Sequence, residues 1–328
     1  MNQGLFGFPS AYGLTDPLSI AEYDSSGVYK IPNGAKELDI LLIGAGGGGG
    51  GGGYAAAGAA AAGGGGGGGG DIIKAQFSTL PIGENSSLII TIGSAGLGGT
   101  YASSVSTGLH PGGVGGSSII RSSDSSGQTS SSSGFLITAK GGNGSPGAAG
   151  GVAGIQIIYG AMITTAGAGQ TSLAGISTLL NILIGSGPSI LNNGGAAGSG
   201  VSTANTSAGG GTGGSIALSP TNKVGLIDTI FIGGTTMVSG GNMGITYGGA
   251  GQNGINFATR FSTNNFGLGG GGGASVGTTV AGTRGGTGGN GYRGGGGGGG
   301  GAVHGGVGVT SGAGGNGGNG YCCIVARG

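Results

Sequence analysis

The chain has 328 residues, of which 98 are glycine and 8 are proline, and its formal net charge at pH 7 is +1. Only 6% of the residues are charged and 36% are hydrophobic, unlike the highly charged, weakly hydrophobic composition of disordered chains. The composition also excludes collagen, because glycine does not recur at every third residue, and it offers no basic field for nucleic acid.

Residues 1–30 have the most ordinary composition of the chain. They hold three of its nine acidic residues and several aromatic side chains, namely Phe6, Phe8, Tyr12, Tyr23 and Tyr29. Aromatic side chains are well suited to contacts with another protein. We therefore predict that residues 1–30 are an attachment segment that docks the chain on a partner, and that residues 31–328 form the main module.

Short runs of β-branched and aromatic residues follow, separated by glycine and serine. Such runs are typical of strands on a pleated, half-buried surface. They predict strands at residues 38–43, 72–77, 88–92, 135–139, 155–159 and 321–325. Because the runs lie near both ends of the chain, we predict an all-β fold in which one β module takes strands from both ends.

Three runs of eight consecutive glycines separate these strands, at residues 46–53, 63–70 and 294–301. Their equal length argues against random linkers. Glycine disfavours an α-helix by about 1 kcal/mol per residue, and it has no side chain with which to build an ordinary sheet core. The polyproline II geometry remains, in which eight residues span roughly 25 Å. We predict that these runs pack side by side as polyglycine II helices, because buried amides and carbonyls must be paired.

Two further segments repeat a three-residue pattern, Gly-Gly-X. Residues 285–291 read GGTGGNG and residues 314–320 read GGNGGNG. With three residues per turn, the X side chains would line one edge of each helix. The pattern therefore predicts glycine edges in contact with neighbours and X side chains that face outward or into a neighbouring sheet.

The middle of the chain, about residues 155–265, is more varied and is predicted to form loops. One short helix is expected at residues 172–184, because five aliphatic side chains there fall on one side of a helix. The region is also rich in aromatic residues. These are the residues that a contact surface would use.

Residues that could carry chemistry are scarce. The only histidines are His110, in a turn sequence, and His304, between glycine tracts. Residues 44–49 match the spacing of a dinucleotide-binding loop, but the glycines that follow exclude the helix that would hold the pyrophosphate. Cys322 and Cys323 are adjacent and would point to opposite faces of a strand. We expect no catalytic, cofactor-binding or metal-ligating residue and no enzymatic activity.

Residues 28–34, of sequence VYKIPNG, precede a strand and a long glycine run, and residues 317–321 close the glycine-rich part before the last strand. In this arrangement the chain resembles the glycine-rich domains of bacteriophage tail proteins. It is similar to the tail-fibre tip adhesins of T-even phages, which use stacked polyglycine II helices. It is also similar to the extracellular glycine-rich region of anaplastic lymphoma kinase, although it lacks the kinase, the membrane span and the cysteines of that receptor.

The resemblance implies a β-sandwich, tumour-necrosis-factor-like or jelly-roll-like, with an inserted bundle of polyglycine II helices. It implies a phage virion protein, a tail-fibre or tail-tip adhesin, whose loops at the far end of the bundle bind a host surface receptor, either an outer-membrane protein or a glycan, without a covalent bond. The candidate receptor contacts are Tyr101, His110, Tyr247, Phe257, Phe261 and Phe266.

The alternative is a capsid decoration, head-fibre or other purely structural virion protein without a receptor, and a depolymerase is the weakest hypothesis. In either virion role the attachment segment would contact other virion proteins. The chain could form a homo-oligomer, a trimer if the β module is tumour-necrosis-factor-like. The first residues lack the pattern of a secretion signal, so we expect assembly in the host cytoplasm and a place on the virion.

Overall fold

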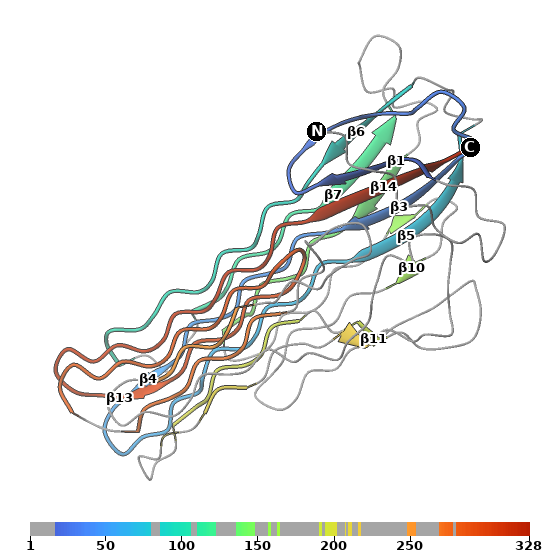
Figure 1. Ribbon diagram of the computed structural model, residues 1–328. Helices are drawn as coiled ribbons and strands as arrows, with labels where there is room; N and C mark the ends of the chain where they lie inside the picture. The colour runs from blue at the N-terminus through green and yellow to red at the C-terminus, as the bar shows by residue number, and fades with distance from the viewer. Residues whose placement is uncertain are drawn as a thin grey trace, which may run out of the picture.

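The computed structural model describes the two ends of the chain and parts of its middle. The described residues are 17–79, 86–105, 110–122, 136–147, 157–158, 163–164, 190–191, 194–201, 207, 209–211, 216–217, 248–253, 269–277 and 280–328. They contain no helix, and most of the strands pair in antiparallel sheets. The expectation of an all-β fold is confirmed for this part of the chain. Figure 1 shows the larger sheets at one end, with wavy glycine-rich segments running side by side to the other end.

The first five-stranded sheet joins the two ends of the chain. The strand from the C-terminal part of the sequence lies between two strands from the N-terminal part and is antiparallel to both. The order of the sheet is β1 (Pro17–Tyr23), β14 (Tyr321–Arg327), β3 (Glu37–Ile43), β5 (Ile72–Ser78) and β10 (Ile163–Thr164).

The second five-stranded sheet is also antiparallel. Its order is β2 (Gly27–Lys30), β6 (Ser87–Thr91), β7 (Ser118–Ser122), β8 (Leu136–Ala139) and β9 (Ile157–Ile158). Two pairs of short strands complete the described structure. β11 (Ile190–Leu191) and β12 (Ile216–Ala217) are antiparallel, whereas β4 (Tyr54–Ala55) and β13 (Val303–His304) are parallel and lie at the end of the molecule away from the sheets (Figure 1).

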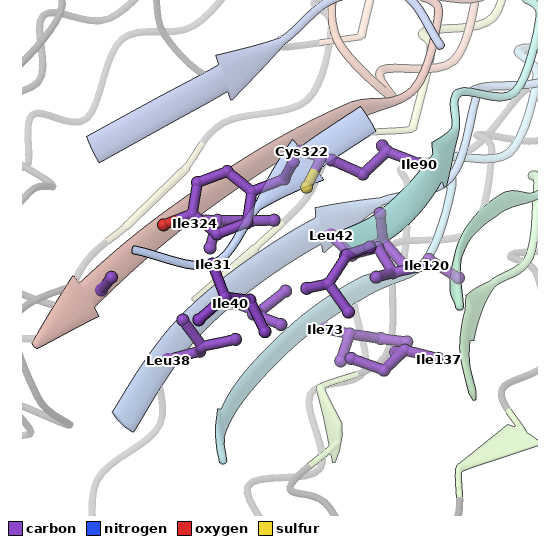
Figure 2. Close-up of a cluster of buried hydrophobic side chains, with 14 of the residues drawn as sticks. Ile31, Leu38, Ile40, Leu42, Ile73, Ile90, Ile120, Ile137, Cys322 and Ile324 are labelled. Atoms are coloured by element: carbon purple, nitrogen blue, oxygen red, sulfur yellow. The ribbon is translucent and has the colours of Figure 1, made fainter. Parts of the chain in front are cut away.

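The side chains of the two large sheets meet in one hydrophobic core (Figure 2). Leu38, Ile40 and Leu42 of β3 alternate with residues on the other face, as the two-residue period of a strand requires. Ile120 of β7 and Ile137 of β8 belong to the same core. Nearly complete burial of each of these aliphatic side chains contributes about 1.5–3 kcal/mol to folding.

Most of the strands predicted from the sequence are present. The runs at residues 38–43, 72–77, 88–92, 135–139 and 321–325 correspond to β3, β5, β6, β8 and β14, and residues 157–158 of the run at 155–159 form β9. β7 was not expected, because its two isoleucines lie between serines and an arginine. Residues 17–30, assigned above to the attachment segment, form β1 and β2. The helix expected at residues 172–184 lies outside the described residues.

Extended segments rich in glycine run side by side from the sheets to the far end, and we call them the glycine bundle. Its members are residues 44–53, 62–71, 93–100, 110–117, 140–147, 194–201, 209–211, 248–253, 269–277, 284–291, 294–302 and 311–320. Residues 44–49, which match a dinucleotide-binding loop in spacing, belong to this bundle as extended chain. Backbone hydrogen bonds between segments hold the bundle together.

Hydrogen bonds around residues 45–53 recur with a period of three residues. Successive amides donate to three different neighbours, and every third amide returns to the same one. Their carbonyls accept from three other segments, which contain Gly96, Ser145 and Gly297 among their donors. The donors Gly46, Gly49 and Gly52 bond Gly318, Gly315 and Gly312; Gly47, Gly50 and Gly53 bond Gly68, Gly65 and Ala62; and Ala45, Gly48 and Gly51 bond Gly116, Gly113 and His110, all at 2.8–3.0 Å. Residues 45–53 are therefore surrounded by backbone on all sides.

Glycine is required in the interior because the neighbouring backbones come too close for a side chain. A Cβ atom on Gly46 would overlap the carbonyl oxygen of Gly295, and one on Gly48 would overlap that of Leu97. A Cβ atom on Gly64 would overlap the carbonyl oxygen of Gly50. These obstacles are backbone atoms held by their own hydrogen bonds, so they cannot rotate away as a side chain could.

The Gly-Gly-X segments lie at the surface of the bundle. Thr287, Asn290, Asn316 and Asn319 are exposed, whereas the glycines Gly286 and Gly315 are buried. The X side chains therefore face outward, as the three-residue period predicts, while the glycine edges contact other segments. A segment can carry side chains only where it lacks a neighbour, which explains why the interior runs contain nothing but glycine.

Candidate functional site at the far end of the glycine bundle

The loops that connect the bundle segments gather at the end away from the two large sheets (Figure 1). There β4 pairs with β13, and the Tyr54 hydroxyl both donates to the carbonyl of Gly306 and accepts from its amide, each at 3.1 Å. Further parallel bridges join Val276 to Val303 and Arg284 to Thr310. These bonds hold loops that are far apart in the sequence in one compact arrangement.

A small hydrophobic core packs against these loops. It consists of Tyr54, Ala102, Val276, Val303 and Val309. Each residue comes from the point where a bundle segment ends and a loop begins, so side chains replace the backbone contacts of the glycine bundle there. The loops are therefore anchored both by hydrogen bonds and by packing.

Four large apolar side chains at this end are more than half exposed, and we call them the tip surface. The exposed fraction is 85% for Val307, 63% for Val105, 55% for Tyr101 and 54% for Val280. Exposed apolar side chains on neighbouring loops mark interaction sites more often than isolated ones do. The tip surface therefore has the chemistry of a contact surface.

Backbone hydrogen bonds connect the three loops that carry the tip surface. The amide of Gly282 donates to the carbonyl of Val307 at 3.0 Å, and the amide of Ser311 donates to the carbonyl of Ala102 at 2.9 Å. Gly282 and Gly308 have φ angles of 77° and 67°, values that L-residues with side chains rarely adopt. Tight glycine turns thus present Val280 and Val307.

Two of the six predicted contact residues lie in the loops at this end. Tyr101 belongs to the tip surface, and His110 is partly buried beside it, with its Nδ1 atom 3.5 Å from the hydroxyl oxygen of Thr100. The other four residues, Tyr247, Phe257, Phe261 and Phe266, lie outside the described part of the chain.

The three valines of the tip surface were not predicted as contact residues. In the sequence, an isolated valine among small residues is indistinguishable from a strand or core residue. The available signal was their position, because Val280 and Val307 lie in short stretches between glycine-rich segments. Such stretches must be turns if the segments on either side pack together.

His304 is the described histidine that lies in the strand pair at this end of the bundle. His304 is buried in β13, where its Nδ1 atom lies 3.4 Å from the carbonyl oxygen of Ala56. Within the described ranges, no three His, Cys, Asp or Glu side chains come together as a metal site would require. The same residues include no helix long and apolar enough to cross a membrane.

Two comparisons with known proteins identify no relative of the chain. Neither a scan against protein-family models nor a search of curated proteins finds a match to the chain.

Proposed function

We propose that the chain is a bacteriophage virion protein, a tail-fibre or tail-tip adhesin, that binds a host surface receptor through its tip surface. The observation that carries this proposal is that Val307, Val105, Tyr101 and Val280, all more than half exposed, belong to the loops around β4 and β13, and these two strands lie at the end of the bundle opposite the large sheets. A surface that must reach another cell is best carried at the end of a stiff support.

The stiffness is attributed to polyglycine II helices in the glycine bundle. The three-residue period of the hydrogen bonds around residues 45–53 supports this assignment, because a polyglycine II helix has three residues per turn and points its amides in three directions. An isolated helix of this kind has a solvated, loose backbone. Mutual hydrogen bonding would convert many such helices into one rigid body.

The two large sheets are proposed to form a sandwich that anchors the bundle. Support comes from their shared core, in which side chains of β3 and β14 in one sheet are clustered with side chains of β6, β7 and β8 in the other. The attachment segment, residues 1–30, includes β1 at this end of the molecule. It would therefore contact the virion on the side opposite the receptor.

The proposal predicts that charge on the tip surface weakens adsorption. Virions carrying Val307→Asp together with Val280→Asp should adsorb to host cells at least about tenfold more slowly, since losing two apolar anchors removes roughly 2 kcal/mol or more of binding. Both side chains are exposed, so the variant should fold normally. The adsorption rate constant and the amount of protein per virion are the measurements.

Val114 provides the matched control for this experiment. Its side chain is 65% exposed, but it lies on the flank of the bundle, in the segment 110–117. Virions with Val114→Asp should adsorb at the wild-type rate. Equal defects in both variants, or no defect in either, would contradict a receptor contact at the tip.

Deleting the gene separates the adhesin from a purely structural virion protein. An adhesin mutant should assemble normal numbers of particles that fail to adsorb. Particles that adsorb normally without the protein would exclude the proposed function, and loss of assembled particles would favour the structural role.

A further inference from the structure

A polar cleft lies on the flank of the molecule, where the glycine bundle joins the sheets. Its volume is about 410 Å³, within the range of small-molecule binding sites. Glycine backbone forms much of its wall together with Ala95, and the polar and aromatic side chains that line it are Asp24, Asn290, Tyr292, Arg293, Asn316 and Asn319. We call it the flank cleft, and it is separated from the tip surface by the length of the bundle.

Asparagine amides in the flank cleft are held in fixed orientations. The Asn316 Oδ1 atom accepts from the amide of Gly98 at 2.8 Å, and the Asn290 Oδ1 atom accepts from the amide of Asn316 at 2.8 Å. The Asn319 Oδ1 atom accepts from the amide of Ala95 at 2.9 Å. Because a backbone amide can only donate, these bonds assign the oxygen, and each Nδ2 group must point in another direction.

The floor of the cleft contains a residue with an unusual backbone. Arg293 has a φ of 34°, and the amide of Gly295 donates to the carbonyl of Tyr292 at 2.8 Å to close a tight turn. A positive φ in a residue with a long side chain persists only where the surroundings impose it, and such residues concentrate at functional sites.

The buried Arg293 side chain imposes this conformation. Its guanidinium lies 2.6 Å from the carboxylate of Asp24 and 3.9 Å from that of Glu22, and it stacks over the ring of Tyr321 at 4.1 Å from the centroid. The positive charge is thus balanced by two carboxylates. The cleft therefore offers no uncompensated cation that would select a phosphate or another anion.

The remaining groups match the hydroxyls and ring faces of a sugar. The amide hydrogens of Asn290, Asn316 and Asn319 can donate to hydroxyl oxygens, and the carboxylate of Asp24 can accept from hydroxyl groups. The ring of Tyr292 is partly exposed, with the Arg293 guanidinium 5.6 Å from its centroid, and it offers an apolar surface beside them. In an extended chain of this kind, Asn316 and Asn319 are roughly 9 Å apart, so a ligand that bonds both must be larger than one small ion.

We propose that the flank cleft binds a neutral oligosaccharide, with the three asparagine amides as donors, Asp24 as acceptor and Tyr292 as the apolar contact. This second binding site does not depend on the proposed receptor contact at the tip. It would give the protein a second attachment to glycan-rich material, on its side rather than at its end.

Calorimetric titration of the full chain with cellohexaose, maltohexaose and hexa-N-acetylchitohexaose tests the proposal. At least one of these should bind with a Kd of about 1 mM or tighter. Tyr292→Ala should weaken that binding at least about tenfold through loss of the ring contact. The double variant Asn290→Asp, Asn316→Asp keeps both Oδ1 acceptors but loses the amide donors, and it should weaken binding at least about fivefold.

Asn253 provides a matched control within the same row of asparagines. Its Oδ1 atom accepts from the amide of Asn290 at 2.8 Å, but its side chain does not line the flank cleft. Asn253→Asp and the tip variant Val307→Asp should both leave oligosaccharide binding unchanged. This expectation holds whether or not the tip variant slows adsorption. Absence of binding by all three sugars at about 10 mM, or unchanged affinity in both cleft variants, would overturn the proposal.

Discussion

Replacing Gly49 by alanine is expected to destabilise the protein by more than about 4 kcal/mol, a value reached only by the most severe single substitutions. The new Cβ atom would overlap the carbonyl group of Gly298 and lie 2.8 Å from the carbonyl oxygen of Gly297. Neither can move freely, because the amide of Gly298 donates to Gly289 and its carbonyl accepts from Gly315, each at 2.8 Å. One methyl group therefore forces apart several segments.

Thermal unfolding of the purified variant measures this effect. The melting temperature should fall by at least about 5 °C, because an unfolding entropy of about 2.1 cal/mol/K per residue gives a shift of roughly 1.5 °C per kcal/mol for 328 residues. Gly58→Ala is the control, since a methyl group there would have no other part of the chain within 4 Å. Gly58 has a φ of 76°, so alanine should still cost about 1–2 kcal/mol. Equal shifts in the two variants would contradict close backbone packing around Gly49.

A second large effect is expected from Asp71, which lies at the junction between the glycine bundle and β5. Its side chain is fully buried, and burial raises the pKa of the carboxyl group from 3.8 to about 7. The backbone and the charge of Lys140 lower this pKa only in part. Within the described residues, neither carboxylate oxygen forms a well-aligned hydrogen bond that would stabilise the charged form.

The raised pKa makes the protein less stable as the pH rises. The unfolded chain loses this proton near pH 3.8, whereas the folded chain keeps it until about pH 7, so the folded state binds the extra proton between these values. Stability from this group is complete below about pH 4, falls progressively between about pH 4 and pH 7, and is fully lost once the pH has passed 7. A shift of about three pKa units corresponds to roughly 4 kcal/mol.

Asp71→Asn should remove most of this dependence. We expect the wild-type melting temperature to fall between about pH 5 and pH 8, and that of the variant to change much less, so that the variant is the more stable protein at about pH 8. Lys140→Met removes a positive charge that lowers the pKa of the Asp71 carboxyl group. The variant should therefore lose more stability than the wild type as the pH rises. If Asp71→Asn keeps the wild-type pH profile, the buried carboxylate is not its source.

Much of the all-β character of the described residues could be predicted from the sequence. The aliphatic run at residues 38–43 suits only a buried strand of this length, and it forms β3. The eight-glycine run at residues 46–53 excludes a helix and an ordinary sheet, because glycine lacks both helix propensity and a side chain. The Gly-Gly-X period at residues 314–320 predicted asparagines on one edge, facing outward or into a neighbouring sheet, and in the structure they are exposed.

The pairing of segments could not be predicted. Residues 46–53 lie beside residues 294–301, and nothing in a run of glycines marks one partner over another, because every amide and carbonyl is equivalent. The pairing of β1 could not be predicted either, because its partner β14 comes from the opposite end of the chain.

The tip surface and the flank cleft show the same contrast between what the sequence predicts and what only the tertiary structure decides. From the sequence alone, Tyr101 and His110 could be assigned to loops and the asparagines to an outer edge, since these follow from local composition and a three-residue period. Only the tertiary structure brings Val280 and Val307 into neighbouring turns, and only it places Asp24 and Arg293 within 2.6 Å of each other. Both arrangements depend on backbone hydrogen bonds and buried charge between remote segments, which leave no local signal in a glycine-rich sequence.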